Sequence, residues 1–143
     1  MTVLAGLLAF AGCGGGDGPS SLSKAEYTHQ LQLVCNKGAQ ERETLVTNIS
    51  RDYYEKREQR TNTKYQEENL LKLIDTYQGT TEKISDLGLP EGDEKKAEEF
   101  IRAREEAAAK VEASPLGTRD NLQAIFENPN EKSQALGVGN CDL

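Results

Sequence analysis

The sequence feature that most constrains the fold is a long amphipathic stretch from Ser23 to Ile49. Glu26 follows Ser23 by three residues, and this spacing is typical of a capping box at the start of a helix. Residues on an arc of about 120° then recur every three or four positions, as on one face of a helix. They are Tyr27, Leu31, Val34, Cys35, Gly38, Leu45, Val46 and Ile49, and Tyr53 continues the series. We therefore predict a helix that begins at Ser23, buries this stripe and ends between Ile49 and Arg60.

Two more long helices are predicted further along the chain. Asn62 and Thr63 are good N-caps for a helix that runs to Ser85. The segment from about Asp93 to Ala113 has the same periodicity, and acidic residues in its first turn suit the helix dipole. The residues expected to face inward are Leu70, Leu73, Ile74, Tyr77, Thr81 and Ile84 in the first of these helices, and Ala97, Phe100, Ile101, Ala107, Ala108 and Val111 in the second.

A short helix is predicted near the C-terminus, from about Thr118 to Glu127. Its apolar residues Leu122, Ile125 and Phe126 should be buried. We expect Asn128-Pro129-Asn130 to interrupt this helix, because proline has no backbone N–H and clashes with the preceding turn. A last turn up to Leu136 and an extended tail should complete the chain.

These helices lie in a chain of 143 residues, of which 29% are charged and 36% hydrophobic, with no Trp. This composition is typical of one small helical domain with a thin core. The predicted fold is therefore all-α: an antiparallel bundle of three long helices plus a short C-terminal helix, formed by residues 23–143.

The segment 1–12 is an apolar run without a charged side chain, and it is too short for a transmembrane helix, which needs about 20 residues. Ala11 and Gly12 directly precede Cys13, and this arrangement resembles the lipobox of bacterial lipoproteins. The resemblance implies that 1–12 is a signal peptide, that a diacylglycerol is attached to the Cys13 thiol, and that cleavage occurs before Cys13. Residues 13–22, rich in Gly and Ser, are then a flexible tether. The implied location is the outer face of the cytoplasmic membrane.

Two features depart from the lipobox pattern. Phe10 stands where Leu is usual, and no Lys or Arg precedes the apolar run. Because basic residues orient such a segment during export, we expect the true start of translation to lie upstream of Met1. The alternative interpretation is a buried N-terminal helix in which Cys13 is an ordinary thiol.

Two cysteines, Cys35 and Cys141, remain once Cys13 is assigned to lipid attachment. Disulfides form and persist in the compartment of an exported protein. A tail that returns along the first helix could bring Cys141 to Cys35. We therefore predict a disulfide that links the first helix to the C-terminal tail, with two independent thiols as the alternative.

Three short stretches and one spacing carry a resemblance over most of the chain after Cys13. They are Leu22-Ser23-Lys24-Ala25-Glu26-Tyr27, the cysteine eight residues after Tyr27, Leu87-Gly88-Leu89-Pro90-Glu91-Gly92-Asp93, and Leu136-Gly137-Val138-Gly139-Asn140-Cys141. They resemble small secreted or lipid-anchored helical proteins of actinobacteria, whose function is mostly uncharacterised. The resemblance implies a helical bundle with the two cysteines joined, and it supplies no active site.

The search for catalytic or metal-binding residues finds few candidates. His29 is the only histidine and lies opposite the buried stripe. Glu26 and His29 have the Glu-x-x-His spacing of ferritin-like metal sites, but such sites need a second motif and further carboxylates. Arg104 falls within an apolar stripe. We expect its aliphatic stem to lie along the edge of the core with the guanidinium in water, and we favour this interpretation over a role of Arg104 in binding an anion. We therefore predict no catalytic residue, no metal and no cofactor.

The net charge of −7 argues against a nucleic-acid partner, because phosphate neutralisation needs clustered Lys and Arg. The predicted function is that of a lipid-anchored extracytoplasmic module, not an enzyme, that acts by contact with another envelope protein. The alternative is a small-molecule-binding lipoprotein with an apolar cavity inside the bundle, for which Tyr27, Tyr77 and Phe100 are candidate lining residues.

Overall fold

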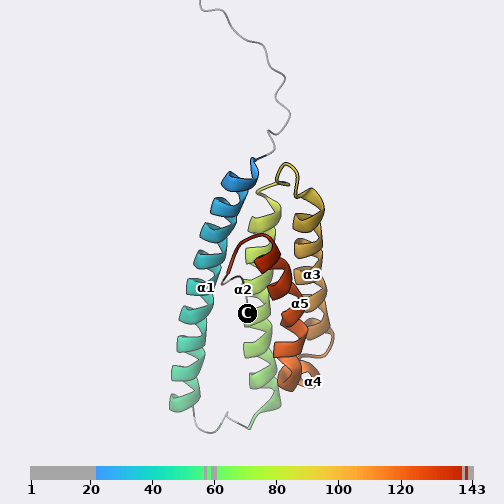
Figure 1. Ribbon diagram of the computed structural model, residues 1–143. Coiled ribbons are helices and arrows are strands. Elements are labelled where there is room, and N and C mark those ends of the chain that lie inside the picture. Colours follow the sequence, from blue (N-terminus) through green and yellow to red (C-terminus); the bar gives the residue numbers. More distant parts are fainter. Residues whose placement is uncertain (1–21, 57, 59–60, 140, 142–143) are drawn as a thin grey trace, which may run out of the picture.

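The computed structural model of the protein describes residues 22–56, 58, 61–139 and 141. Three long helices run antiparallel to one another: α1 (Lys24–Glu55), α2 (Thr63–Ser85) and α3 (Glu94–Ala113) (Figure 1). A short helix, α4 (Pro115–Thr118), and a 3-10 turn, η2 (Arg119–Asn121), lead into α5 (Leu122–Ala135). α1 packs against α2, α2 against α3, and α3 against α5. The predicted all-α antiparallel bundle is confirmed.

Polar side chains define the starts of α1 and α2 at the predicted positions, and a glycine follows the end of α2. The Ser23 hydroxyl accepts a hydrogen bond from the Glu26 N–H at 3.4 Å, and the Glu26 carboxylate accepts one from the Ser23 N–H at 3.1 Å, which completes the capping box. The Asn62 side chain accepts from the Tyr65 N–H at 3.3 Å at the start of α2. Gly88 follows α2 with a φ of 75°, a conformation that favours glycine.

Two hydrophobic clusters make up the core. The upper cluster, near the N-terminus of α1 in Figure 1, contains Tyr27, Leu31, Cys35, Ile84, Ala97, Phe100, Leu136, Val138 and Cys141. The lower cluster joins α2, α3 and α5 and contains Leu70, Ile74, Tyr77, Ala107, Ala108, Val111 and Phe126. Three residues of the C-terminal tail belong to the upper cluster, so this tail is part of the core.

The second half of the α1 stripe is largely exposed, so the prediction that the whole stripe is buried was wrong there. Val46 is 47% exposed and Tyr53 is 41% exposed, while Leu45 and Ile49 are half-buried. The reason is the layout of the bundle. α2 is the main helical neighbour of α1, and the described residues of the tail contact α1 at Thr28, Gln32 and Cys35, all in its upper half.

α5 continues through Pro129, so the predicted interruption was wrong. The helix begins at Leu122 rather than near Thr118, and Pro129 lies buried inside it. The cost of proline inside a helix is about 3 kcal/mol, because one hydrogen bond is lost and the ring crowds the preceding turn. Phe126, Pro129 and Ser133 all lie on the buried face of α5. Burial of that face compensates for the local cost.

Gly38 sets how closely α1 approaches α2. A Cβ atom at this position would lie 2.5 Å from Thr80 Oγ1. Gly38→Ala should therefore lower the free energy of unfolding by about 1 to 3 kcal/mol, the usual cost of overpacking a core. Gly79→Ala is the matched control, because a Cβ there meets nothing within 4 Å, and alanine should stabilise the helix by up to about 1 kcal/mol. Urea unfolding measures both, and equal destabilisation by the two substitutions would contradict the close approach.

Candidate functional site

A disulfide fixes the C-terminal tail to α1. Cys35 and Cys141 are bonded, with their Cα atoms 4.8 Å apart, and both are buried. The predicted pairing is confirmed. Two side chains of α1 also donate hydrogen bonds to tail carbonyls. A disulfide that joins the ends of a small domain in this way is typical of proteins in oxidising, extracytoplasmic compartments.

Arg104 is fully buried at the junction of α2, α3 and the tail, so the prediction that its guanidinium lies in water was wrong. The guanidinium donates hydrogen bonds to Thr81 Oγ1 at 2.9 Å and to the Tyr77 carbonyl at 3.3 Å. It also donates to the Cys141 carbonyl. Hydrogen bonds from a charged donor contribute about 1.5 to 3 kcal/mol each. This set of acceptors allows a cation to be held in the interior.

Aromatic rings complete the surroundings of Arg104. Its Cζ atom lies 3.7 Å from the centroid of the Tyr77 ring and 5.6 Å from that of Phe100, where cation–π attraction contributes. Tyr77 also packs edge-on against Phe126, with centroids 4.9 Å apart. The sequence contained one signal that Arg104 is buried, because this residue stands in the apolar stripe of α3. The hydrogen-bond acceptors of its guanidinium come from other segments, however, and the sequence of α3 by itself does not reveal them.

His29 is exposed on α1, as its position opposite the buried stripe predicted. Glu26, the other member of the Glu-x-x-His pair, is engaged in the capping box. Hydrogen bonds from the Ser23 hydroxyl and N–H lower the pKa of the Glu26 carboxyl. Within the part of the chain that the structure describes, no three His, Cys, Asp or Glu side chains lie close enough together to hold a metal ion. Cys13 lies outside the described residues, and its lipid attachment stays a prediction.

The residues proposed to line a ligand cavity, in the alternative function of a small-molecule-binding lipoprotein, are all buried in the core. They are Tyr27, Tyr77 and Phe100. Tyr27 and Phe100 belong to the upper cluster and Tyr77 to the lower one. Burial raises the pKa of the Tyr27 hydroxyl. The rings pack against their core neighbours, and a ligand cavity between them stays a prediction.

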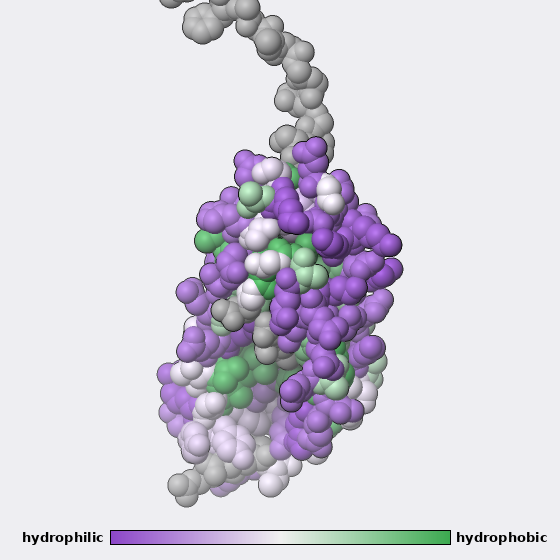
Figure 2. All heavy atoms as spheres, viewed as in Figure 1, coloured by the Kyte–Doolittle hydropathy of each residue, from purple (hydrophilic) through white to green (hydrophobic). Residues whose placement is uncertain are grey.

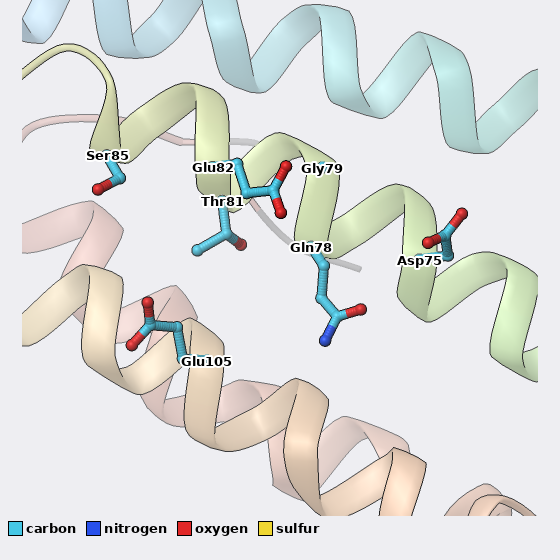
Figure 3. A pocket seen from close by; sticks show the side chains of 7 residues that line it. All are labelled: Asp75, Gln78, Gly79, Thr81, Glu82, Ser85 and Glu105. Carbon is cyan, nitrogen blue, oxygen red and sulfur yellow. The ribbon is translucent and has the colours of Figure 1, made fainter.

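An open hollow of about 520 Å³ lies between α2 and α3 (Figure 3). Its lining is mostly polar and includes three carboxylates, those of Asp75, Glu82 and Glu105. Figure 3 shows these carboxylates pointing in different directions rather than towards one point. Paired acids in catalysis need one carboxyl held in an apolar setting beside the other. The hollow does not have that arrangement.

Comparison with known proteins leaves the family of this chain open. No protein-family model, curated protein or solved structure matches it. The resemblance to small actinobacterial proteins therefore stays a prediction. None of the helices in the described ranges has both the length and the apolar character needed to cross a bilayer.

Proposed function

We propose that this protein is a lipid-anchored extracytoplasmic module that acts by contact with another component of the cell envelope and not by catalysis. Cys13 directly follows the small residues Ala11 and Gly12, and a glycine-rich run comes next. Two acyl chains are sufficient for stable membrane attachment without a basic patch. A chain with a net charge of −7 needs such an attachment, because it is not attracted to anionic lipid. The buried disulfide is consistent with the same compartment.

The position at which the chain enters the bundle is the observation that best supports this proposal. Leu22 leads into α1 at one end of the bundle (Figure 1). α1 has 32 residues and is about 48 Å long at 1.5 Å per residue. An anchor at that end leaves the opposite end and the sides of the bundle free for contacts away from the membrane.

The entry point is tied to the connection between α2 and α3. The Leu22 carbonyl accepts a hydrogen bond from the Glu91 N–H at 2.9 Å. Lys24 and Lys96 form ion pairs with Asp93 at 2.7 and 2.6 Å. Hydrogen bonds from these two lysines lower the pKa of the Asp93 carboxyl. A tether that starts here is therefore joined to the packed body and not to a fraying helix end.

Cys13→Ala should abolish lipid attachment. In a bacterial host that processes lipoproteins, the wild-type chain should incorporate an alkyne-tagged fatty acid and sediment with the membranes. The variant should lose the label and leave the membrane fraction, because the thiol that accepts the lipid is gone. The matched control combines Cys35→Ala with Cys141→Ala, which removes two thiols, keeps Cys13 and should stay labelled.

The experiment separates export from acylation. Each variant is also expressed with a signal peptide that begins with lysines in place of residues 1–12. Inefficient export of the protein by its own residues 1–12 then cannot hide the result. A label that persists in Cys13→Ala would contradict the proposed anchor. So would an unlabelled wild-type chain behind the basic signal peptide.

A further inference from the structure

The C-terminal tail brings Cys141 to one face of α1. The described residues of this tail, after the end of α5, are 136–139 and 141. Thr28 and Gln32 of α1 donate hydrogen bonds to tail carbonyls at 3.3 and 3.2 Å, and Cys35 forms the disulfide. These three α1 residues are spaced by four and three positions, so they share one face of the helix. Cys35 therefore bonds to a partner that arrives from a distant part of the chain.

Contacts of the folded bundle support this pair. Leu136 and Val138 of the tail are buried in the upper cluster, and Arg104 donates a hydrogen bond to the Cys141 carbonyl. Figure 2 shows hydrophobic atoms in the upper half of this side of the molecule, with hydrophilic side chains around them. The tail contacts join segments that are distant in the sequence, so they exist only once the bundle has formed. Before that point they do not favour Cys141 over another thiol.

The sequence contains three cysteines, and the third is much closer to Cys35 than Cys141 is. Cys13, which lies outside the described residues, precedes Cys35 by 22 positions, whereas Cys141 follows it by 106. The entropic cost of closing a loop in an unfolded chain grows as three-halves of the logarithm of the loop length. Closing the shorter loop should therefore be favoured about tenfold, a difference of about 1.4 kcal/mol. In the unfolded chain, the non-native pair Cys13–Cys35 should form first.

Formation of α1 does not take Cys35 out of reach of Cys13. Leu22, directly before the N-cap of α1, precedes Cys35 by 13 positions, or about 20 Å at 1.5 Å per residue. Cys13 precedes Leu22 by nine positions, and nine residues extend over at most about 30 Å. The chain before α1 is therefore long enough to return along the helix to Cys35 as long as the tail has not yet bonded there.

The order of export adds to the advantage of Cys13. An exported chain crosses the membrane with its signal peptide first, so residues near the N-terminus reach the oxidising side earliest. Cys13 and Cys35 then meet oxidants while Cys141, which follows Cys35 by 106 positions, has not yet crossed. Of the other two thiols, only that of a free Cys13 is available to Cys35 during this interval.

We propose that acylation of Cys13 directs disulfide formation, because it removes the thiol that competes for Cys35. When the diacylglyceryl group is transferred, a carbon–sulfur bond forms at Cys13 and the thiol proton leaves with the head group of the lipid donor. That sulfur can no longer form a disulfide. Cys35 and Cys141 then lose two protons and two electrons to the disulfide of an exchange protein, which becomes a dithiol. The inference rests on the proposed function in one respect, since it gives the lipid anchor a second role.

Oxidation of the full, unacylated chain in concentrated urea measures the competition between the two pairs. A mixture of reduced and oxidised glutathione lets the disulfides equilibrate, and alkylation followed by peptide mass spectrometry quantifies each pair. The wild-type chain should contain Cys13–Cys35 in about tenfold excess over Cys35–Cys141. Cys13→Ala is the matched control, because it should form only Cys35–Cys141. Equal amounts of the two pairs in the wild-type chain would overturn the inference.

Refolding from urea then shows what a blocked Cys13 changes. Alkylation of the oxidised native chain modifies the sulfur of Cys13 alone, since Cys35 and Cys141 are bonded. After reduction and dilution from urea into the glutathione mixture, this blocked chain and Cys13→Ala should reach the native bridge at the same rate. The wild-type chain should be several-fold slower, because the Cys141 thiolate must attack the Cys35 sulfur and release Cys13. A wild-type chain as fast as the blocked chain would contradict the proposal.

A comparison in a bacterial host separates this inference from the anchor itself. The chain from Cys13 onward is exported behind a signal peptide that lacks the lipobox, so that Cys13 remains a free thiol. The yield of the native bridge should fall several-fold, and Cys13→Ala behind the same signal peptide should restore it. An unchanged yield with the free thiol would overturn the inference. Because none of these chains carries lipid, mispairing can be absent while the Cys13 labelling succeeds, and mispairing can occur while that labelling fails.

Discussion

Replacing Cys35 and Cys141 together with alanine should lower the free energy of unfolding by about 4 to 5 kcal/mol. The bridge joins residues separated by 106 positions. In the chain-entropy model, closing a loop of about 100 residues restricts the unfolded chain by that amount. Small domains are stable by only about 5 to 15 kcal/mol in total. The variant should therefore be close to its unfolding transition at about 37 °C.

Urea unfolding, followed by circular dichroism, measures this loss in the double variant and in the reduced wild-type chain. Both should show a lower unfolding midpoint than the oxidised protein. Cys13→Ala, which removes a thiol outside the bridge, should change the unfolding free energy by less than about 0.5 kcal/mol. Identical midpoints for the oxidised and reduced chains would show that the bridge does not stabilise the fold.

Arg104→Ala should destabilise the protein by about 3 to 5 kcal/mol, the range for truncating a large buried side chain. Arg104 is the largest fully buried side chain of the described residues. Its removal leaves a cavity between α2, α3 and the tail. It also leaves the Cys141 and Tyr77 carbonyls without the guanidinium donor. Unfolding in urea gives the magnitude, and a loss below about 1 kcal/mol would contradict this account.

Two further substitutions separate the packing of Arg104 from its polar contacts. Arg104→Met keeps most of the volume but removes the donors, and should cost about 1 to 3 kcal/mol. Arg102→Ala is the surface control, because Arg102 is exposed and faces Glu106 only at 3.8 Å. It should cost less than about 0.5 kcal/mol. An Arg104→Met variant as stable as the wild type would mean that the polar contacts only offset the cost of burying the charge.

The stability of the Arg104 contacts should also depend on the disulfide. Cys141 supplies one of the acceptors for the guanidinium, and its position is set by the bond to Cys35. The disulfide and the Arg104 guanidinium both depend on the position of Cys141, so their contributions to the free energy of unfolding are not additive. Arg104→Ala should therefore cost less in the reduced chain than in the oxidised one.

The elements that the sequence predicted well depend on short-range chemistry. Ser23 and Glu26 form a capping box that needs only residues three positions apart, and Asn62 caps its helix through the Tyr65 N–H. The 3.6-residue period of the apolar positions is also visible locally. The start of α1 and both limits of α2 and α3 therefore lie within one or two residues of the prediction, whereas the end of α1 was predicted only to fall between Ile49 and Arg60. The disulfide was predictable because assigning Cys13 to lipid left only one pair of cysteines.

The sequence by itself determined the helical class of this protein, the limits of α2 and α3, and its pair of bonded cysteines. Only the tertiary structure decided that Arg104 is buried, that Pro129 stays inside a helix and that the lower half of the α1 stripe is open. The physical reason is the same in each case. A helical pattern shows which residues share a face, but burial depends on segments far away in the chain. The described residues of the tail meet Arg104 and the upper half of α1, and no local pattern within α1 or α3 specifies that placement.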